Sequence, residues 1–137
     1  MELKPTADVF LLGALYQELM EDEQADAQYT DSESRDRMAA FLESGEKAYL
    51  AEEDGETVGY ALVDFSPAPP YLHHFYICRS HRRKGYGSTF FELLMSSLSI
   101  SQIDLNVFVW NERGQAFWKS LGFKPRCIAM RYDNDNA

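Results

Sequence analysis

The stretch RSHRRKGYGSTFFELL, residues 79–94, decides the fold, because it joins a strand-like segment to a helix-like run through a basic loop with two glycines. The chain has 13 basic residues against 22 acidic ones, yet four of the 13 fall within six positions of this stretch. They are Arg79, Arg82, Arg83 and Lys84. A strand that turns directly into a helix leaves the first helical N–H groups unpaired and directs the positive end of the helix dipole outward.

The glycines of this loop indicate its chemistry. Gly85 and Gly87 let the backbone bend tightly and approach a ligand without an intervening Cβ atom. Such a loop at the start of a helix binds phosphate groups, and the neighbouring basic side chains add positive charge for a di- or tri-anion. The alternative interpretation is a solvated basic turn with a glycine bend.

Two common nucleotide motifs do not fit this loop. A dinucleotide-binding fingerprint needs a third glycine at position 90, which is Phe. A P-loop needs its lysine after the last glycine, whereas Lys84 precedes both glycines. His73 and His74 are neighbours on a predicted strand, so their side chains are expected on opposite faces, and no metal site is predicted.

The surrounding sequence predicts a mixed α/β (α+β) fold in one domain, residues 1–137. Helical spacing of Leu residues predicts a helix over 7–20, and a second short helix follows through Met38. An Asp54-Gly55 pair between two apolar runs predicts a β-hairpin. Beyond a proline-rich break, the pattern predicts alternating strands and helices. The predicted segments are a strand at 71–78, a helix at 87–98, a strand at 103–109, a helix at 112–121 and a last strand at 123–132.

Charge and cysteine content indicate which partners and which cellular compartment to expect. The net charge of −9 argues against nucleic acid or an anionic membrane as the main partner. It is compatible with a cationic substrate, and also with solubility alone. Cys78 and Cys127 form no disulfide framework, and no segment resembles a leader or a membrane span, so a cytoplasmic protein is expected.

Two sequence blocks resemble the GNAT superfamily of N-acetyltransferases. The loop Arg82-Arg83-Lys84-Gly85-Tyr86-Gly87 is similar to its coenzyme A motif, Gln/Arg-x-x-Gly-x-Gly/Ala. A second block, from Asn111 to Phe123, resembles the family's asparagine-led helix that ends in Gly-Phe. The resemblance covers essentially the whole chain. It implies a mixed, mostly antiparallel sheet with splayed central strands and about four helices on its two faces.

The resemblance also implies where acetyl-CoA would bind. The pyrophosphate would lie on the backbone N–H groups of residues 83–88, and the pantetheine would run beside the strand Phe75–Ile77 as an added β-strand does. The N–H of Phe75 would stabilise the oxyanion at the thioester. The cofactor-binding residues expected on this basis are Phe75, Tyr76, Ile77, Arg82, Arg83, Lys84, Gly85, Tyr86, Gly87, Ser88, Asn111 and Phe117. For Asn111 and Phe117, a helix N-cap and a core aromatic remain alternatives.

The sequence departs from the family pattern at the catalytic groups. Many relatives carry a tyrosine seven residues after the asparagine, where this chain has Trp118, whose indole N–H hydrogen-bonds but does not release a proton. A glutamate that serves some relatives as the base is matched by Tyr71. Tyr71, His73 and His74 are therefore the candidate bases, with a strand histidine of no catalytic role as the alternative.

The implied reaction is direct transfer of the acetyl group to a primary amine while both substrates are bound, without a metal. The acidic connection between the first two helices borders the acceptor approach in this family, which favours a small cationic amine. A non-catalytic, CoA-binding sensor or partner-binding module is the alternative function. The expected assembly is a monomer or a homodimer.

Overall fold

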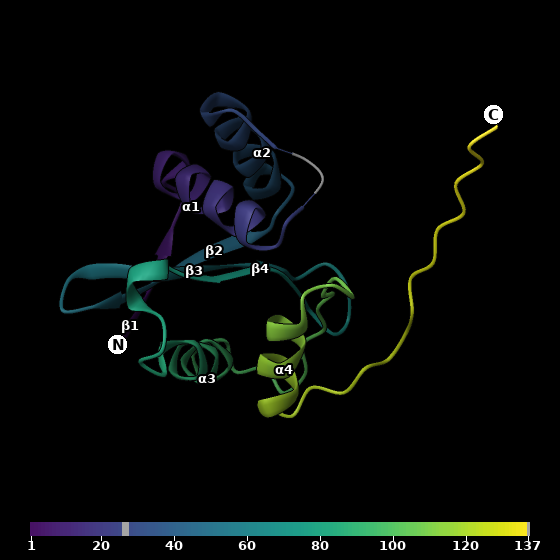
Figure 1. Cartoon of the computed structure of the whole chain (residues 1–137). Helices are drawn as coiled ribbons and strands as arrows, with labels where there is room; N and C mark the ends of the chain where they lie inside the picture. The colour runs from purple at the N-terminus through teal and green to yellow at the C-terminus, as the bar shows by residue number, and fades with distance from the viewer. Residues whose placement is uncertain (26–27, 137) are drawn as a thin grey trace.

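The computed structural model describes residues 1–25 and 28–136 and has a four-stranded antiparallel sheet between two layers of helices (Figure 1). The strand order is β1-β2-β3-β4. The strands are β1 (Glu2–Thr6), β2 (Lys47–Glu53), β3 (Glu56–Asp64) and β4 (Tyr71–Ile77). Helices α1 (Val9–Asp22) and α2 (Asp31–Glu43) cover one face, and α3 (Tyr86–Leu98) and α4 (Glu112–Ser120) lie on the other. A short 3₁₀ helix, η1 (Arg79–His81), follows β4.

Local sequence signals account for most of these boundaries. The Asp8 carboxylate caps α1 by accepting hydrogen bonds from two backbone N–H groups, and Thr30 and Glu33 form a reciprocal capping box at the start of α2. The β2–β3 turn has positive φ angles at Asp54 (52°) and Gly55 (80°), as the predicted hairpin requires.

A hydrophobic core lies on each face of the sheet. Leu12, Leu15 and Leu19 of α1 are buried against β2, β3 and β4 on one face. Phe90 and Leu94 of α3 are completely buried on the other. Both amphipathic helices therefore bury the stripe that their sequence periodicity indicates, and together they hold β4 between two packed layers.

A β-bulge overturns the expectation that His73 and His74 lie on opposite faces. The register of β3 and β4 shifts where Leu62 pairs with His74 but the next residue, Val63, pairs with Leu72. Two residues of β4 thus oppose one position of β3, which cancels the usual alternation. The two imidazole rings lie 4.5 Å apart, and both contact Phe41 of α2. The described residues nevertheless contain no cluster of metal-ligating side chains.

The two strands predicted after α3 are not formed as predicted. Segment 103–109 makes one parallel bridge, between Asp104 and Tyr71, and then separates from β4. Segment 123–132 forms no strand, and every residue from 124 to 136 is exposed. Figure 1 shows this C-terminal tail running away from the sheet. An alternating sequence gives a segment the tendency to form a strand. A stable β-ladder also needs the free edge of another strand close enough for hydrogen bonds.

Strand β1 was not predicted from the sequence; it pairs with β2 through the register Glu2–Glu52 to Thr6–Ala48. The strand is short and contains Pro5, which has no N–H and is tolerated because β1 is an edge strand. In the described part of the chain, no helix is long and apolar enough to cross a bilayer.

Candidate active site

The outer edge of β4 is open at Phe75. The N–H of Cys78 donates to the carbonyl of Val58 at 2.8 Å, and residues of an antiparallel strand alternate between facing their partner and facing away. By this alternation, the backbone polar groups of Phe75 and Ile77 face away from β3. Segment 103–109 is joined to the start of β4 by the hydrogen bond from Leu72 N to Asp104 O, which is 2.7 Å long. Phe75 therefore presents its N–H where the two segments have diverged.

The loop after η1 provides unpaired donors next to this edge. Its backbone is left-handed at Arg83 (φ 64°) and Gly85 (φ 74°), and no side chain caps the start of α3. Among the described residues, the N–H groups of Tyr86, Gly87 and Ser88 have no hydrogen-bond partner. The first turn of α3 also contains no acidic residue. These donors, together with the positive helix dipole, fit a phosphate group.

Gly87 brings this loop into contact with α4. A Cβ atom at Gly87 would lie 3.0 Å from the ring of Phe117 and 3.8 Å from the side chain of Ile77. Gly87 lies within α3 and does not have a positive φ, unlike Gly85, so close packing rather than backbone conformation requires the glycine here.

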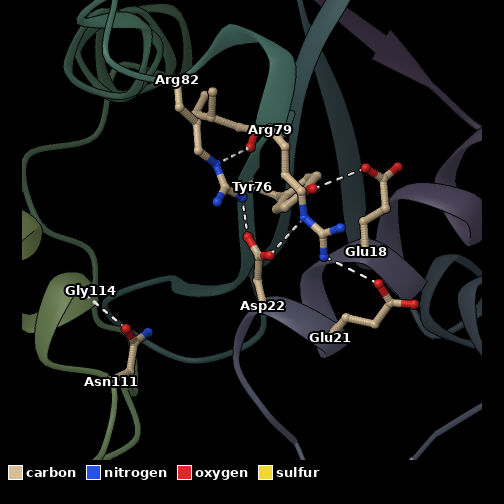
Figure 2. A network of polar contacts seen from close by, with 9 residues as sticks. Glu18, Glu21, Asp22, Tyr76, Arg79, Arg82, Asn111 and Gly114 are labelled. Atoms are coloured by element: carbon tan, nitrogen blue, oxygen red, sulfur yellow. Dashed lines mark hydrogen bonds and ion pairs between the residues drawn. The ribbon is translucent and has the colours of Figure 1, made fainter.

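Two of the four basic residues do not face the loop's donors. The Nε of Arg82 donates to the carbonyl of Ile77 at 3.0 Å, and its guanidinium also contacts the carboxylate of Asp22 at the end of α1. Arg79 binds Asp22 at 3.0 Å and Glu21 at 3.2 Å (Figure 2). The charge of Arg82, which the sequence places at the phosphate site, is thus paired with Asp22 in this structure, and this ion pair joins α1 to the end of β4.

Arg83 and Lys84 remain as the cations of the loop, since neither forms an ion pair with a described residue. Tyr76 faces α1 instead of the open edge, and its hydroxyl donates to Glu18 at 3.0 Å. Only the backbone of Tyr76 is therefore near the proposed cofactor path.

His74 is a core residue. Its side chain is buried, stacks on Tyr16 with ring centroids 4.6 Å apart, and lies 3.0 Å from the Tyr60 hydroxyl through Nδ1. Burial lowers its pKa to about 3, so the ring is neutral at physiological pH. Because α1 and α2 cover it, His74 does not reach an acceptor amine, and we remove it from the candidate bases.

His73 is paired with a carboxylate that sequence analysis did not identify. Its Nδ1 lies 2.7 Å from Oε1 of Glu46, which is on the connection between α2 and β2 and has a side chain only 9% exposed. The His73 side chain is 32% exposed. A buried carboxylate on one ring nitrogen fixes the orientation of the imidazole and leaves Nε2 as the nitrogen that can accept a proton. No local motif signals a pair separated by 27 positions.

Glu23 is a second acidic group near the start of β4. Burial, and then the neighbouring charge of Asp22, raise its pKa, and its charge also contributes to the raised pKa of Tyr71. The Tyr71 and His73 rings lie 5.9 Å apart. Tyr71, His73 and Glu23 thus form one polar region, although they come from β4 and from the residue after α1.

A pocket of about 320 Å³ lies between the end of α1 and the start of α4. Its floor includes Glu23 and Trp110, whose indole N–H donates to the backbone carbonyl of Glu23 at 3.0 Å. The other lining residues are Asp22, Gln24, Asn111, Glu112 and Arg113. Asn111 is an N-cap, with its side-chain oxygen accepting from Gly114 N at 2.9 Å (Figure 2).

Trp118 belongs to an aromatic cluster under the open edge. Its ring lies 5.0 Å from that of Phe75, 5.7 Å from Phe91 and 5.1 Å from Phe123, in edge-to-face arrangements. Phe117 is stacked on Phe75 at 6.2 Å. The cluster therefore holds Phe75 from the α3 side of the sheet.

Comparison with known proteins agrees with this geometry. The model of the acetyltransferase (GNAT) family matches residues 12–123, which include both β4 and the loop before α3. The chain belongs to the GNAT family. It is accordingly an acyltransferase of class EC 2.3.1, and the acetyl donor typical of this family is acetyl-CoA.

Solved structures share the GNAT fold at low sequence identity. A possible acetyltransferase from Clostridium difficile 630 has a TM-score of 0.75 at 16% identity, with 98% of this chain and 96% of that chain covered. A predicted acetyltransferase with acetyl-CoA from Clostridium acetobutylicum has a TM-score of 0.71 at 18% identity, with coverage of 96% and 95%.

An aminoglycoside 6'-N-acetyltransferase from Acinetobacter haemolyticus has a TM-score of 0.69 at 18% identity, with 98% of this chain and 99% of that chain covered. No curated protein sequence matches the chain significantly.

Proposed function

We propose that this GNAT protein transfers the acetyl group of acetyl-CoA to the primary amine of a small cationic substrate, with both substrates bound together. The observation that carries the proposal is the continuity of donors from the free N–H of Phe75 to the uncapped start of α3. The N–H of Phe75 would donate a hydrogen bond to the carbonyl oxygen of a thioester. The N–H groups at the start of α3 would donate to a pyrophosphate.

The loop 83–88 would hold the pyrophosphate through its backbone N–H groups, with Arg83 and Lys84 adding charge. The Phe75–Ile77 edge would pair with the pantetheine. Bound acetyl-CoA supplies an activated acetyl group as a thioester. The Phe75 N–H would donate to the carbonyl oxygen as negative charge develops there, and the aromatic cluster around Phe75 keeps this donor in position.

His73 is the proposed general base. An alkylammonium has a pKa near 10.4, so it must lose a proton before or during attack on the thioester. The hydrogen bond to Glu46 orients the imidazole and would stabilise the imidazolium formed when His73 takes that proton. Tyr71 is a weaker candidate, because burial raises the pKa of its hydroxyl.

Trp118 is proposed to pack beside the leaving sulfur without acting as an acid. Its indole N–H donates hydrogen bonds but does not release a proton at physiological pH. A thiol with a pKa of about 8.5 is a good leaving group, so no formal acid is required.

The proposed acceptor site is the pocket beside Glu23 and Trp110. The entrance for the acceptor is less acidic than the sequence indicates, because the carboxylates of Asp22 and Glu21 are paired with Arg79 and Arg82. Glu23 has no ion pair with a described residue and is half-buried, so it is the carboxylate best able to bind an ammonium group. The facing indole adds a cation–π surface.

Two measurements test the proposal. Calorimetry should detect acetyl-CoA binding, and release of the CoA thiol should depend on added amine and be faster with diamines and aminosugars than with neutral amino acid amides. Binding without amine-dependent release would support the non-catalytic sensor instead. Failure to bind acetyl-CoA would contradict both functions.

A further inference from the structure

His81 is the last residue of η1 and lies directly before the loop that would hold the pyrophosphate. Its side chain is only 14% exposed, and Nε2 lies 3.4 Å from Oε2 of Glu56, the first residue of β3. On the other side of the ring, Nδ1 lies 2.9 Å from Oγ of Ser80. A ring nitrogen that faces a carboxylate carries a proton, so Nε2 donates to Glu56. The β2–β3 hairpin and the turn of η1 therefore fix the orientation of the imidazole.

The route of the chain after β4 brings His81 to this hairpin. The N–H of Cys78 donates to the carbonyl of Val58 at 2.8 Å, and the Cys78 thiol lies 3.9 Å from the carbonyl of Thr57. The backbone N–H of His81 then donates to the carbonyl of Cys78 at 2.9 Å. The turn η1 is thus attached to the start of β3, so His81 has a rigid support in the sheet.

The His81 ring also contacts the residue at the far end of the loop. It stacks on the ring of Tyr86, with centroids 6.2 Å apart and an angle of 29° between the ring planes. Offset aromatic pairs at this separation attract each other. Tyr86 is the first residue of α3, and its N–H is among the donors without a partner in the described part of the chain. The contact between His81 and Tyr86 therefore joins the two ends of segment 82–85.

The conformation of this segment explains why such a contact matters. Arg83 has a φ of 64°, a left-handed conformation that a residue with a Cβ atom keeps only where the surrounding structure requires it. Arg83, Lys84 and Gly85 are all exposed, so packing of their own side chains does not hold the backbone there. Donors that are already ordered bind an anion more tightly, because no further ordering is needed on binding.

We propose that His81 is a positioning residue for the cofactor. Held by Glu56 and stacked on Tyr86, it keeps the loop 83–88 in the conformation in which its N–H groups bind the pyrophosphate. This inference rests on the proposed function, because it takes the loop as the acetyl-CoA site. His81 does not contact the reacting atoms, so it should affect the affinity for acetyl-CoA and leave kcat unchanged.

A comparison of two acetyl donors tests this role. S-Acetylpantetheine has the same thioester as acetyl-CoA but lacks the pyrophosphate, so it makes no use of the loop. His81→Ala should raise KM for acetyl-CoA about three- to tenfold, the effect of losing one aromatic contact, and leave KM for S-acetylpantetheine unchanged. His81→Phe retains the stack on Tyr86 and should recover part of the affinity. A general loss of structure would instead affect both donors alike.

Two acidic residues of the hairpin test the contact with Glu56. Removal of a negative charge near an anionic cofactor strengthens binding by electrostatics alone. Glu56→Ala should nevertheless weaken acetyl-CoA binding about twofold, because the imidazole loses its support. The control is Asp54→Asn, which removes the same charge from the same hairpin, keeps a residue type that accepts the positive φ there, and should not weaken binding.

Calorimetry separates this inference from the proposed function. A wild-type protein that does not bind acetyl-CoA would overturn both. A wild-type protein that binds it, with the same affinity in His81→Ala or an equal loss for both donors, would overturn only the role of His81. If His81→Ala does not fold, an unchanged affinity for acetyl-CoA in Glu56→Ala and His81→Phe would overturn that role as well.

Discussion

His73 Nδ1 lies 2.7 Å from Glu46 Oε1, although the two residues come from β4 and from the connection before β2. The β-bulge in β4 makes this contact, because it turns His73 to the same face as His74, toward α2. One imidazole is consequently paired with a carboxylate, whereas its neighbour is buried and neutral. A one-residue shift in register thus gives two adjacent histidines different partners: a carboxylate for His73 and the aromatic core for His74.

Replacement of His73 tests its role as base. His73→Ala should lower kcat by about 10²-fold or more, the usual contribution of a general base, and leave the affinity for acetyl-CoA unchanged. Added imidazole should restore part of the activity. Glu46→Gln should lower kcat less, because the amide still accepts a hydrogen bond but does not stabilise the imidazolium. Unchanged turnover in His73→Ala would exclude the residue as base.

Arg82 and Arg83 are neighbours in the loop before α3, but we expect their substitution to affect different properties, stability for Arg82 and acetyl-CoA affinity for Arg83. Arg83→Ala should weaken acetyl-CoA binding by about 1–2 kcal/mol, the scale of one charge-assisted hydrogen bond. Arg82→Ala should instead lower the free energy of unfolding by a similar amount, because Arg82 joins Asp22 of α1 to the carbonyl of Ile77. Calorimetry and urea unfolding of both variants measure the two effects. Equal losses of affinity would contradict this division.

Gly87 offers a test of the packing at the loop. Gly87→Val should nearly abolish acetyl-CoA binding, because its side chain would collide with Phe117 and obstruct the start of α3. Gly45→Ala is the control, because this glycine also has a positive φ and open space around it but lies on the connection between α2 and β2, outside the loop, so only backbone strain of about 1 kcal/mol is expected there. Unchanged calorimetric affinity in Gly87→Val would refute the loop as the cofactor site.

Substitutions of Trp118 test the proposal that the CoA thiolate leaves without a general acid. Trp118→Phe should retain most activity while lowering stability by about 1–2 kcal/mol through the lost aromatic packing. Trp118→Tyr should gain little in kcat, since departure of the thiolate is not limiting. A large rise in kcat for Trp118→Tyr would show that the missing acid matters.

Acceptor selectivity should depend on Glu23. Glu23→Gln should raise KM for a diamine several-fold and leave KM for a neutral amine unchanged, because only the cation loses an ionic partner. Rates with the diamine should fall as salt screens the attraction. The control is Glu2→Gln, an exposed carboxylate on β1, far from the pocket. A preference for acidic acceptors, insensitive to salt, would contradict a cationic substrate.

His74 should make stability depend on pH. Its pKa is about 3 in the folded protein against a usual 6.5, so the unfolded state binds the extra proton between these values. The stabilisation is complete above pH 6.5 and is lost as the pH falls toward 3, by an amount on the order of 3–5 kcal/mol. His74→Gln should flatten the decline in the free energy of unfolding over this range. An identical decline in the variant would contradict the assignment.

The loop at 79–94, the asparagine-led helix and the Asp54-Gly55 hairpin were predictable, because each depends on neighbouring residues. Glycines in a turn and apolar residues at helical spacing act over a few positions, so the sequence alone indicates the GNAT fold and the position of the basic loop before α3. The short edge strand β1 was missed because its pattern is too brief and includes Pro5.

Only the tertiary structure decided how the charged residues are paired and which strands find partners. Arg82 was expected at the phosphate, but α1 brings Asp22 to it from 60 positions away. Glu46 meets His73 through a bulge that no spacing rule reveals. Residues 123–132 have the sequence of a strand but pair with no strand in the described part of the chain. Such contacts depend on elements distant in sequence, and local propensity contains no information about which of them meet.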